Sequence, residues 1–389
     1  MARLALRWAG PPPRVESHVR ERVPTATPPR TLALTLLRGP TLAPVTAEID
    51  AGLRVAEVAV RMGARTAFEL TFSVGRHRSS WGTLLANGYF DPGTRLALVT
   101  DGDARVLVDG IVTGQELSLS ASGRTQTLLV SGEDLSVLMD LDEVVLQYPG
   151  EPAHVRAQVI IARYATYGIE PAVVPAPIVE IPVPTERIPT QAETDYRYLR
   201  RLAEDVGYLF AVQAGPEPGR SVAYWGPQVR TGTPQAPILA DGGAVSELRF
   251  RLDGLARTEV TATILDPATR TLLPIPVPDV RVVRAQLAAR PAPTLRHCRL
   301  LGAAKRTVAG AAASALGAMA LTSDAVTAKG TLDVSGHGQS LRAGGLVEIQ
   351  GVGAAYDGAY YVAEVTHTID RSGYRQHFVL RRDGLGAPE

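Results

Sequence analysis

The sequence predicts a mainly β protein with an α+β insert. Short runs of β-branched and aromatic residues alternate with polar residues along much of the chain, as half-buried strands do. Glycine (37) and proline (29) are plentiful and supply turns between these runs. One two-stranded pattern also occurs twice, near the N-terminus and at the C-terminus. At 389 residues the chain is long enough for two to four domains.

The C-terminal copy of this pattern is the clearer one. Two predicted strands, 359–370 and 374–382, flank a turn that ends at Gly373, where glycine tolerates a positive φ. Asp357-Gly358 predicts another tight turn just ahead of them. Apolar residues recur with a period of two and predict one buried face, formed by Tyr361, Ala363, Val365, Ile369, Tyr374, Phe378 and Leu380.

The N-terminal copy follows the same order. Asp109-Gly110 precedes a predicted strand at 111–120, which a Ser122-Gly123 turn joins to a second strand at 125–131. A short apolar strand stands before each copy, at 95–99 and at 346–349. The chain therefore contains either an internal duplication or two unrelated meanders.

The first part of the chain predicts an arm followed by a barrel. Residues 1–30 are rich in Pro and Arg, which fits either a floppy terminus or an arm that reaches a neighbour. From residue 31 the pattern is β, and the closely spaced strands suggest a barrel. These strands are 31–37, 54–62, 67–74 and 95–99, with a connecting piece at 81–87 and a turn at 89–93.

The middle of the chain has helical periodicity. Residues 154–167 predict a helix that stops at Gly168, and a Pro-rich extended segment follows. Thr194 is a predicted N-cap, and Gly207 ends that second helix before a strand begins at 208. Its apolar stripe is Leu199, Leu202, Ala203 and Val206.

The region after residue 235 alternates between the two patterns. Residues 248–252 and 259–265 predict a strand pair, which Asp266-Pro267 interrupts. Residues 280–321 predict mainly helix, and 325–334 return to β. The C-terminal β unit is therefore expected to be built from two separate pieces of chain.

The composition of the chain indicates which cellular compartment and which kinds of binding partner to expect. The net charge of +1 gives no reason to expect nucleic acid or an anionic membrane as a partner. The single cysteine, Cys298, excludes an internal disulfide framework and is expected to be a small buried thiol. The start has no signal-peptide core, and the longest apolar run, 308–321, is too short to span a bilayer. We expect assembly in the cytoplasm.

No residue is assigned a catalytic, cofactor-binding or metal-binding role, and no cofactor is expected. The histidines lack paired ligand spacing; they are His18, His77, His154, His297, His337, His367 and His377. His367 lies on an apolar strand face and predicts a satisfied, semi-buried ring. The run Ser131-Gly132-Glu133-Asp134 predicts a turn or helix start rather than a carboxylate pair.

Four stretches resemble, in order, the late-control-D family of tail hub proteins from contractile phages and injection systems. They are FDPGTRLALV at 90–99 with DGIVTGQELSLSASGRTQTLLVSGEDLSVLMD at 109–140, TDYRYLRRLAEDVGYLFAV at 194–212, ILDPATRTLLPI at 264–275 and YDGAYYVAEVTHTIDRSGYRQHFVLRRDG at 356–384. Each motif alone is weak, but four in order are specific. The resemblance covers most of the chain after residue 31.

The resemblance implies two similar antiparallel β-barrel domains per chain plus a peripheral α+β domain. The expected boundaries are 1–30 for the arm, 31–140 for the first hub barrel, 141–235 with 267–321 for the peripheral domain, and 236–266 with 322–389 for the second barrel. Three such subunits would form a ring of six similar barrels.

The implied function is that of a structural baseplate hub. A homotrimer would join the six-fold inner tube to a three-fold spike within a tail-like particle, either a virion or an injection system. Expected partners are the spike protein, the inner tube or tube-initiator protein and other baseplate proteins. Relatives such as VgrG continue into an OB-fold and a β-helical needle, whereas this sequence ends at Glu389, so we expect a separately encoded spike.

Two other functions stay open. A cell-wall hydrolase would need two carboxylates facing each other in a cleft. A carbohydrate-binding β module of a tail tip would need exposed aromatic residues, and the chain has only three Trp. Arginine supplies nearly all the positive charge, since Lys305 and Lys329 are the only lysines. This bias fits either a protein interface or the codon usage of a GC-rich genome.

Overall fold

The computed structural model describes residues 34–75, 79–100, 103–119, 125–265, 269–300 and 306–388. The predicted N-terminal arm lies outside these residues, as do the Ser122-Gly123 turn, Asp266-Pro267, His77 and Lys305. None of the helices in these ranges is long and apolar enough to cross a membrane.

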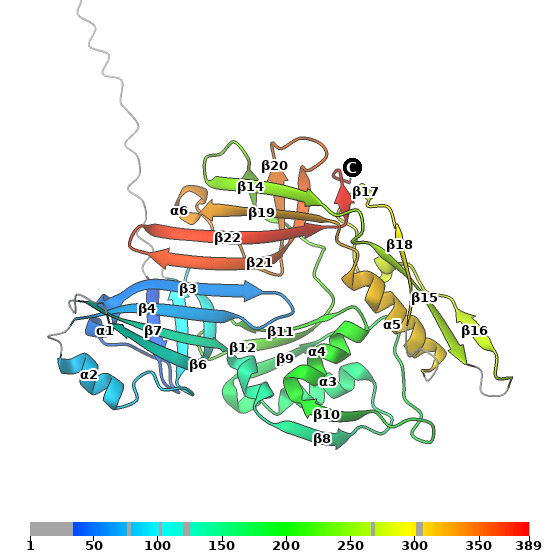
Figure 1. Ribbon diagram of the computed structural model, residues 1–389, viewed down its shortest axis with the longest axis horizontal. Helices are drawn as coiled ribbons and strands as arrows, with labels where there is room; N and C mark the ends of the chain where they lie inside the picture. The colour runs from blue at the N-terminus through cyan, green and yellow to red at the C-terminus, as the bar shows by residue number, and fades with distance from the viewer. Residues whose placement is uncertain are drawn as a thin grey trace, which may run out of the picture. The chain divides into compact units, whose positions relative to one another are not determined.

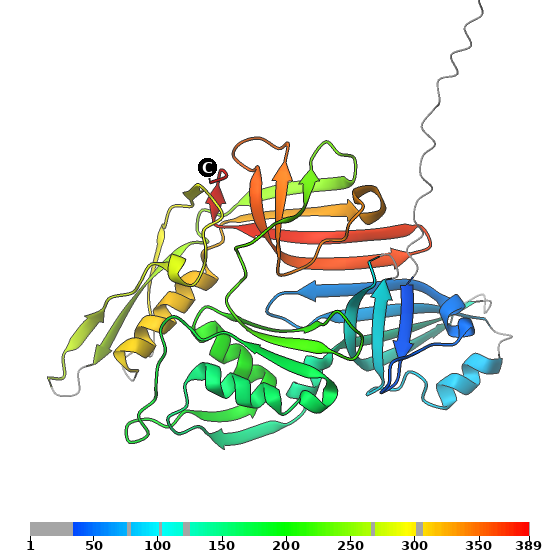
Figure 2. The ribbon, with the colours of Figure 1, turned by 180° about the vertical axis from the view of Figure 1, so that it is seen from behind.

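Strands from the beginning and the end of the chain form one large sheet (Figures 1 and 2). Its N-terminal half comprises β1 (Leu34–Arg38), β2 (Ala43–Pro44), β3 (Leu53–Arg61), β4 (Ala67–Gly75), β5 (Arg95–Thr100), β6 (Arg105–Leu119) and β7 (Thr125–Asp134). Its C-terminal half comprises β13 (Gln235–Leu239), β14 (Val245–Leu252), β19 (Val326–Asp333), β20 (Leu346–Gln350), β21 (Gly358–Asp370) and β22 (Gly373–Arg382).

The strand order is β14-β19-β22-β21-β3-β4-β7-β6-β5-β1-β2, with β20 paired to β21 and β13 to β20. Every pairing is antiparallel except the one between β13 and β20. Short helices lie within each half: α1 (Ala47–Gly52), α2 (Ser79–Ala86) and α6 (Val334–His337). Each half has its own core, and β21 and β22 contribute side chains to both.

The α+β part lies in the middle of the sequence. Its elements are η1 (Leu135–Asp140), β8 (Glu143–Gln147), α3 (Ala153–Ala162), η2 (Ala165–Tyr167), β9 (Ile169–Val173), β10 (Thr190–Thr194), α4 (Asp195–Asp205), β11 (Leu209–Ala214) and β12 (Ser221–Gly226). They pack around Trp225, Tyr198 and Phe210. A further group comprises β15 (Thr258–Leu265), β16 (Leu272–Ile275), η3 (Val280–Val282), β17 (Arg290–Pro291), β18 (Arg296–Arg299), α5 (Val308–Leu321) and β23 (Gly384–Leu385).

The mainly β class with an α+β part is confirmed, and so are several local predictions. Thr194 caps α4 by accepting a hydrogen bond from the Arg197 amide. Gly168 ends η2 with a φ of 81°, although the helix predicted over 154–167 is divided into α3 and η2. The hairpin of β21 and β22 turns between Asp370 and Gly373 as expected. These features depend on residues close together in the sequence, which is why the sequence alone predicts them.

The predicted face of β21 is wrong in its first part because the strand contains a β-bulge. The register with β22 shifts between Val362 and Glu364, so Ala363 is an extra residue. Tyr360 and Val362 therefore share a face with Val365, whereas Tyr361 and Ala363 turn to a separate cluster around Leu287. A strict period of two cannot reveal a bulge, because the extra residue exchanges the two faces.

The predicted turn before the N-terminal hairpin is also wrong. Asp109-Gly110 lies inside β6, where the Asp109 carboxylate pairs with Arg95 at 2.8 Å. A Cβ on Gly110 would lie 2.2 Å from the Glu133 carbonyl oxygen. Glycine is therefore required here for close packing of two strands rather than for a turn.

Three further predictions differ from the structure. Among residues 280–300 and 306–321, only η3 and α5 are helical, because the chain forms β17 and β18 in between. The strands predicted at 248–252 and 259–265 exist but do not pair: β14 pairs with β19, and β15 with β16 and β18. Cys298 is exposed on β18, not buried.

The strand β15 also bears on the expected domain boundaries. We placed residues 236–266 in the second barrel, but β15 packs on α5 within the other group of elements. The reason is that Val260 and Ala262 match the small side chains of α5, Ala311 and Ala315. The division into two barrels and a peripheral domain otherwise stays a prediction.

Replacing Phe378 with alanine should destabilise the protein by about 3–5 kcal/mol, as expected for a large core aromatic residue. Phe378 is 2% exposed and lies across Gly330 in the core of the C-terminal half. Urea unfolding measures the change. The neighbouring exposed His377 provides the control: His377→Ala should stay within about 0.5 kcal/mol. Equal effects of the two substitutions would contradict the register of β22.

Acid should destabilise the protein through His367. Burial, and then the nearby Arg105, lower the pKa of this histidine from 6.5 to about 3, so the folded protein holds the ring neutral. The unfolded chain binds the proton first, and stability is therefore lost as the pH falls from about 6.5 towards 3, by at most about 1.4 kcal/mol per pH unit. Thermal unfolding of the wild type and of His367→Gln at pH 7 and pH 4.5 measures this.

The Gln variant should lose less stability on acidification, because its amide can bond to the Tyr374 hydroxyl without titrating. In the wild type the Tyr374 hydroxyl lies 2.5 Å from Nδ1 of His367, and the Gln376 amide nitrogen lies 3.2 Å from the same atom. Identical pH dependence in both proteins would contradict the neutral, buried ring.

Candidate functional site

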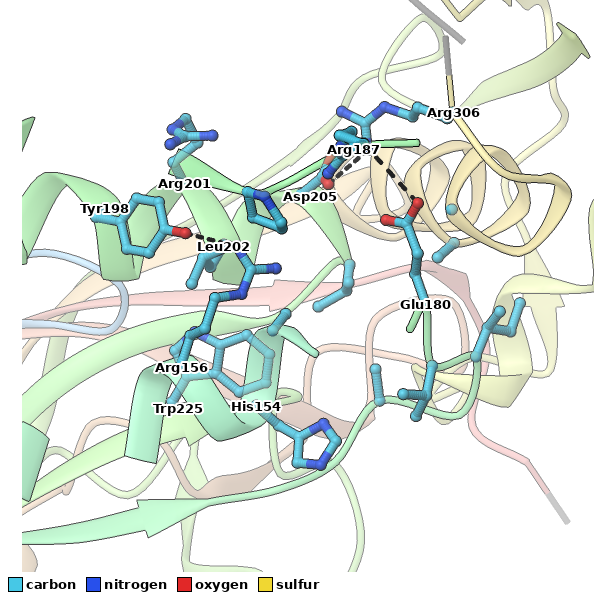
Figure 3. A pocket seen from close by; sticks show the side chains of 18 of the residues that line it. His154, Arg156, Glu180, Arg187, Tyr198, Arg201, Leu202, Asp205, Trp225 and Arg306 are labelled. Carbon is cyan, nitrogen blue, oxygen red and sulfur yellow. Dashed lines mark hydrogen bonds and ion pairs between the residues drawn. The ribbon is translucent and has the colours of Figure 1, made fainter. Parts of the chain in front are cut away.

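A cavity of about 360 Å³ lies among α3, α4, α5 and the segment 176–190 (Figure 3). Its wall carries the charged side chains of Arg156, Glu180, Arg187, Arg201, Asp205 and Arg306, with His154, Tyr198 and Trp225 beside them. The helical periodicity of the sequence predicted α3 and α4, but the sequence did not indicate that these residues meet.

The charged groups of this cavity are engaged with one another. Arg306 donates to Asp205 at 2.6 Å, and the Ser314 hydroxyl donates to the same carboxylate at 2.9 Å. Glu180 accepts a hydrogen bond from the Thr307 hydroxyl at 2.9 Å, and Arg187 lies 3.8 Å away. These contacts tie the segment 176–190 to the start of α5, and α5 to α4.

The other side of the cavity rests on a buried polar network. Arg156 donates to the Tyr198 hydroxyl at 2.5 Å, and the Tyr198 ring stacks on Tyr148. Tyr148 donates in turn to Gln191 at 2.7 Å, and Gln191 donates to Asp195. Each group serves to hold its neighbour. The arrangement therefore orders the α+β part, and we assign it no chemistry.

The two carboxyl groups in the run 131–134, Glu133 and Asp134, both have structural roles. Asp134 caps η1 through the Ser136 amide at 2.8 Å, as expected for the turn or helix start predicted over residues 131–134, although residues 131–133 belong to β7. Burial raises the pKa of Asp134 to about 6. Glu133 pairs with Arg65 at 2.9 Å. In the described residues, no group of three or more His, Cys, Asp or Glu could hold a metal ion.

The strongest functional signal is a repeat in the large sheet. In chain order the N-terminal half has β1, β3, β4, β5, β6 and β7, and their spatial order is β3-β4-β7-β6-β5-β1. The C-terminal half has β13, β14, β19, β20, β21 and β22, in the spatial order β14-β19-β22-β21-β20-β13. Both are the same permutation of six strands, and they differ in one direction: β1 is antiparallel to β5, whereas β13 is parallel to β20. This shared topology favours the internal duplication over two unrelated meanders.

The two hairpins also agree in the position of a β-bulge and in a hydrogen bond beside it. The register of β6 with β7 shifts between Val112 and Gly114, as that of β21 with β22 does around Ala363. Just before the shift, the Val112 amide donates to the Thr94 carbonyl, as the Val362 amide donates to Gly345. The bulge therefore occurs at the same place in each half.

The two halves are joined by the second part of β21. Residues 358–361 pair with β20, and beyond the bulge residues 364–370 pair with β3. The junction alternates a buried apolar face with a polar face on which Arg61 and Glu364 approach to 3.5 Å. One half of the chain thus continues the sheet of the other.

Each half also has a strand edge without a partner among the described residues. The equivalent second part of β6, residues 113–119, pairs with β7 on one side only. The strand β14, at the end of the sheet, pairs with β19 on one side only. The sequence predicted β6 and β14 as strands but could not show these open edges, because partners distant in sequence decide them.

No family model and no curated protein matches the sequence. The fold, however, is similar to that of solved tail proteins. A 43 kDa tail protein of prophage MuSo2 from Shewanella oneidensis has a TM-score of 0.61 at 16% identity, covering 91% of this chain and 99% of that one. A tail protein from Neisseria meningitidis has a TM-score of 0.58 at 15% identity, covering 91% and 98%.

A third similar structure is a type VI secretion system component from E. coli, described as similar to the T4 bacteriophage tail proteins gp27 and gp5. Its TM-score is 0.52 at 13% identity, and the match covers 87% of this chain and 76% of that one. At these identities the comparisons establish a common architecture. The chain has the fold of phage tail proteins and of their type VI secretion counterparts.

Proposed function

We propose that this protein is the structural baseplate hub of a contractile tail-like particle. In this proposal three copies form a ring with pseudo-six-fold symmetry, because each chain contributes two similar β units. The single observation that carries the proposal is the repeated strand order on one continuous sheet. The proposal is supported by the fold that this chain shares with two tail proteins and with a type VI secretion component.

The ring would connect parts of different symmetry. Six similar units suit a six-fold inner tube on one face, while three identical chains suit a three-fold spike on the other. The proposed partners are accordingly the inner tube or tube-initiator protein, a three-fold spike and other baseplate proteins. The particle itself is either a phage virion or a related injection system.

The proposed role is structural rather than catalytic. The cavity beside α4 contains paired charges, and its carboxylates are held by arginine and hydroxyl groups. A hydrolase of cell-wall polysaccharide would need one carboxylate free to attack or to activate water and a second to donate a proton. No observation favours that function, so we propose no second one.

The purified protein should form a stable trimer at micromolar concentration, with more than about 1,600 Å² buried at each contact between two subunits, as stable interfaces do. Light scattering coupled to size exclusion measures the mass. Negative-stain electron microscopy should show a ring with a central hole and six similar lobes. The same preparation, incubated with purified cell walls, should not clear their turbidity.

A stable monomer, with and without a candidate spike protein, would contradict the proposal. So would a ring that binds neither an inner-tube protein nor a spike protein in pull-down experiments. Clearing of cell walls by the wild type would point to the hydrolase instead. Loss of that activity in Asp205→Asn, but not in the exposed Glu217→Gln, would then locate it in the cavity.

A further inference from the structure

We infer that the open edge of β6 pairs with the open edge of β14 in a second copy of this chain, antiparallel and in a defined register. This rests on the proposed function in that it places the contact within the homotrimeric ring. It goes further, because it names the strands, the residue pairs and the order of the chains. The argument starts from the junction that each chain already contains.

The junction inside the chain has a counterpart in the open edges. The repeat makes β6 equivalent to β21 and β14 equivalent to β3. Inside the chain β21 pairs with β3, from Glu364 opposite Arg61 to Asp370 opposite Val55. Within the chain, the C-terminal half therefore joins the N-terminal half by the antiparallel pairing of β21 with β3. The same contact applied between chains joins β6 of one copy to β14 of the next.

The register follows from the two hydrogen-bonded ladders. The bulges make Gly114 of the N-terminal half equivalent to Glu364 of the C-terminal half. The pairings of β3 with β4 and of β14 with β19 make Ala59 equivalent to Arg251. Transferring the inner junction then places five pairs opposite one another: Gly114 with Asp253, Gln115 with Leu252, Glu116 with Arg251, Leu117 with Phe250, and Ser118 with Arg249. Leu119 comes next to Leu248, where the register of β14 with β19 shifts.

Two of these pairs, together with the contact of Leu119 and Leu248, are chemically complementary, although the register was derived from geometry alone. On one face Glu116 meets Arg251, an opposite-charge pair of the kind that stabilises neighbouring strands. On the other face Leu117 and Leu119, 48% and 65% exposed, meet Phe250 and Leu248, which already pack on the core of the C-terminal half. A shift of one residue would place Leu117 opposite an arginine and lose both matches.

A second copy is the occupant that fits both edges at once. An open strand edge with exposed leucines is prone to pair with other strands, and a ring removes the hazard by pairing every edge. Pairing of the β6 edge with the β14 edge of the next chain is a head-to-tail contact. The chains form a closed ring when the rotation from one chain to the next is a whole-number fraction of a full turn. Residues 1–33 are the alternative occupant, and the experiment includes them.

Cysteine pairs test the register in the full-length chain. Cys298 is exposed and is first replaced by alanine. Ser118→Cys with Arg249→Cys places two thiols opposite each other, where Cβ atoms on paired strands lie about 5 Å apart. Ser118→Cys with Asp253→Cys is the matched control, because the second thiol moves four residues along the chain, just past the end of β14 and about 13 Å away.

Mild oxidation should convert the first pair into covalent dimers and a trimer on non-reducing gels, with loss of the monomer band. The control pair and each single cysteine should stay monomeric on the gel. A trimer by light scattering that cross-links only in the control pair, or in neither pair, would overturn this inference and leave the proposed hub intact. Cross-linked species beyond the trimer would overturn closure at three.

A monomer by light scattering would overturn both proposals. If hydrogen exchange then showed β6 protected, with protection lost on deleting residues 1–30, the N-terminal segment would be the true occupant of the edge. A cross-linked trimer that binds neither tube nor spike would instead support the edge pairing and contradict the hub. The failures of the two proposals are therefore distinguishable.

Charge reversal provides an independent test in the absence of cysteines. Glu116→Arg or Arg251→Glu alone places like charges opposite each other and should raise the concentration at which the ring dissociates by roughly tenfold or more. The double variant restores an opposite-charge pair and should return it towards the wild-type value. Glu217→Arg, in an exposed turn, is the control and should change nothing. Additive effects in the double variant would contradict the pairing.

Discussion

The large sheet depends on β21 sharing one of its edges between two partners. Residues 361–370 of this strand pair with β22 on one side, while on the other side β20 gives way to β3 where Ala363 bulges out. A slip of one residue in this strand would turn Val365 and Ile369 out of two cores at once. The bulge therefore fixes the register that holds the two ends of the sequence together.

Outside the sheet, a buried ion cluster holds the end of α5 and η3. Asp324 accepts hydrogen bonds from Arg230 at 2.6 and 2.7 Å and pairs with Arg284 as well. Burial lowers the pKa of Arg284 to about 10, which leaves it charged at neutral pH. Removing Asp324 alone would strand two buried cations, which costs far more than the ion pairs add. The cluster thus favours a single position for these elements.

The sequence predicted what neighbouring residues determine. The Thr194 cap, the Gly168 stop and the β21–β22 hairpin each arise within a few residues, so propensity and periodicity suffice. The bulge at Ala363, the partner of β15 and the exposure of Cys298 depend on strands far away in the sequence, and these predictions were wrong. For the same reason the pattern predicted β6 and β14 as strands but not their open edges, and the cavity beside α4 was missed altogether.

The duplication is imperfect at one position that matters in acid. His367 lies opposite Val58 in the junction within the chain, and the equivalent residue of β6 is Leu117. Protonation can therefore charge the inner junction but not its counterpart between chains. In the proposed ring, low pH would open each subunit along its own middle while neighbouring subunits stayed attached. The two halves of each chain would stay linked through residues 135–234, so the ring would loosen at three points without releasing any subunit.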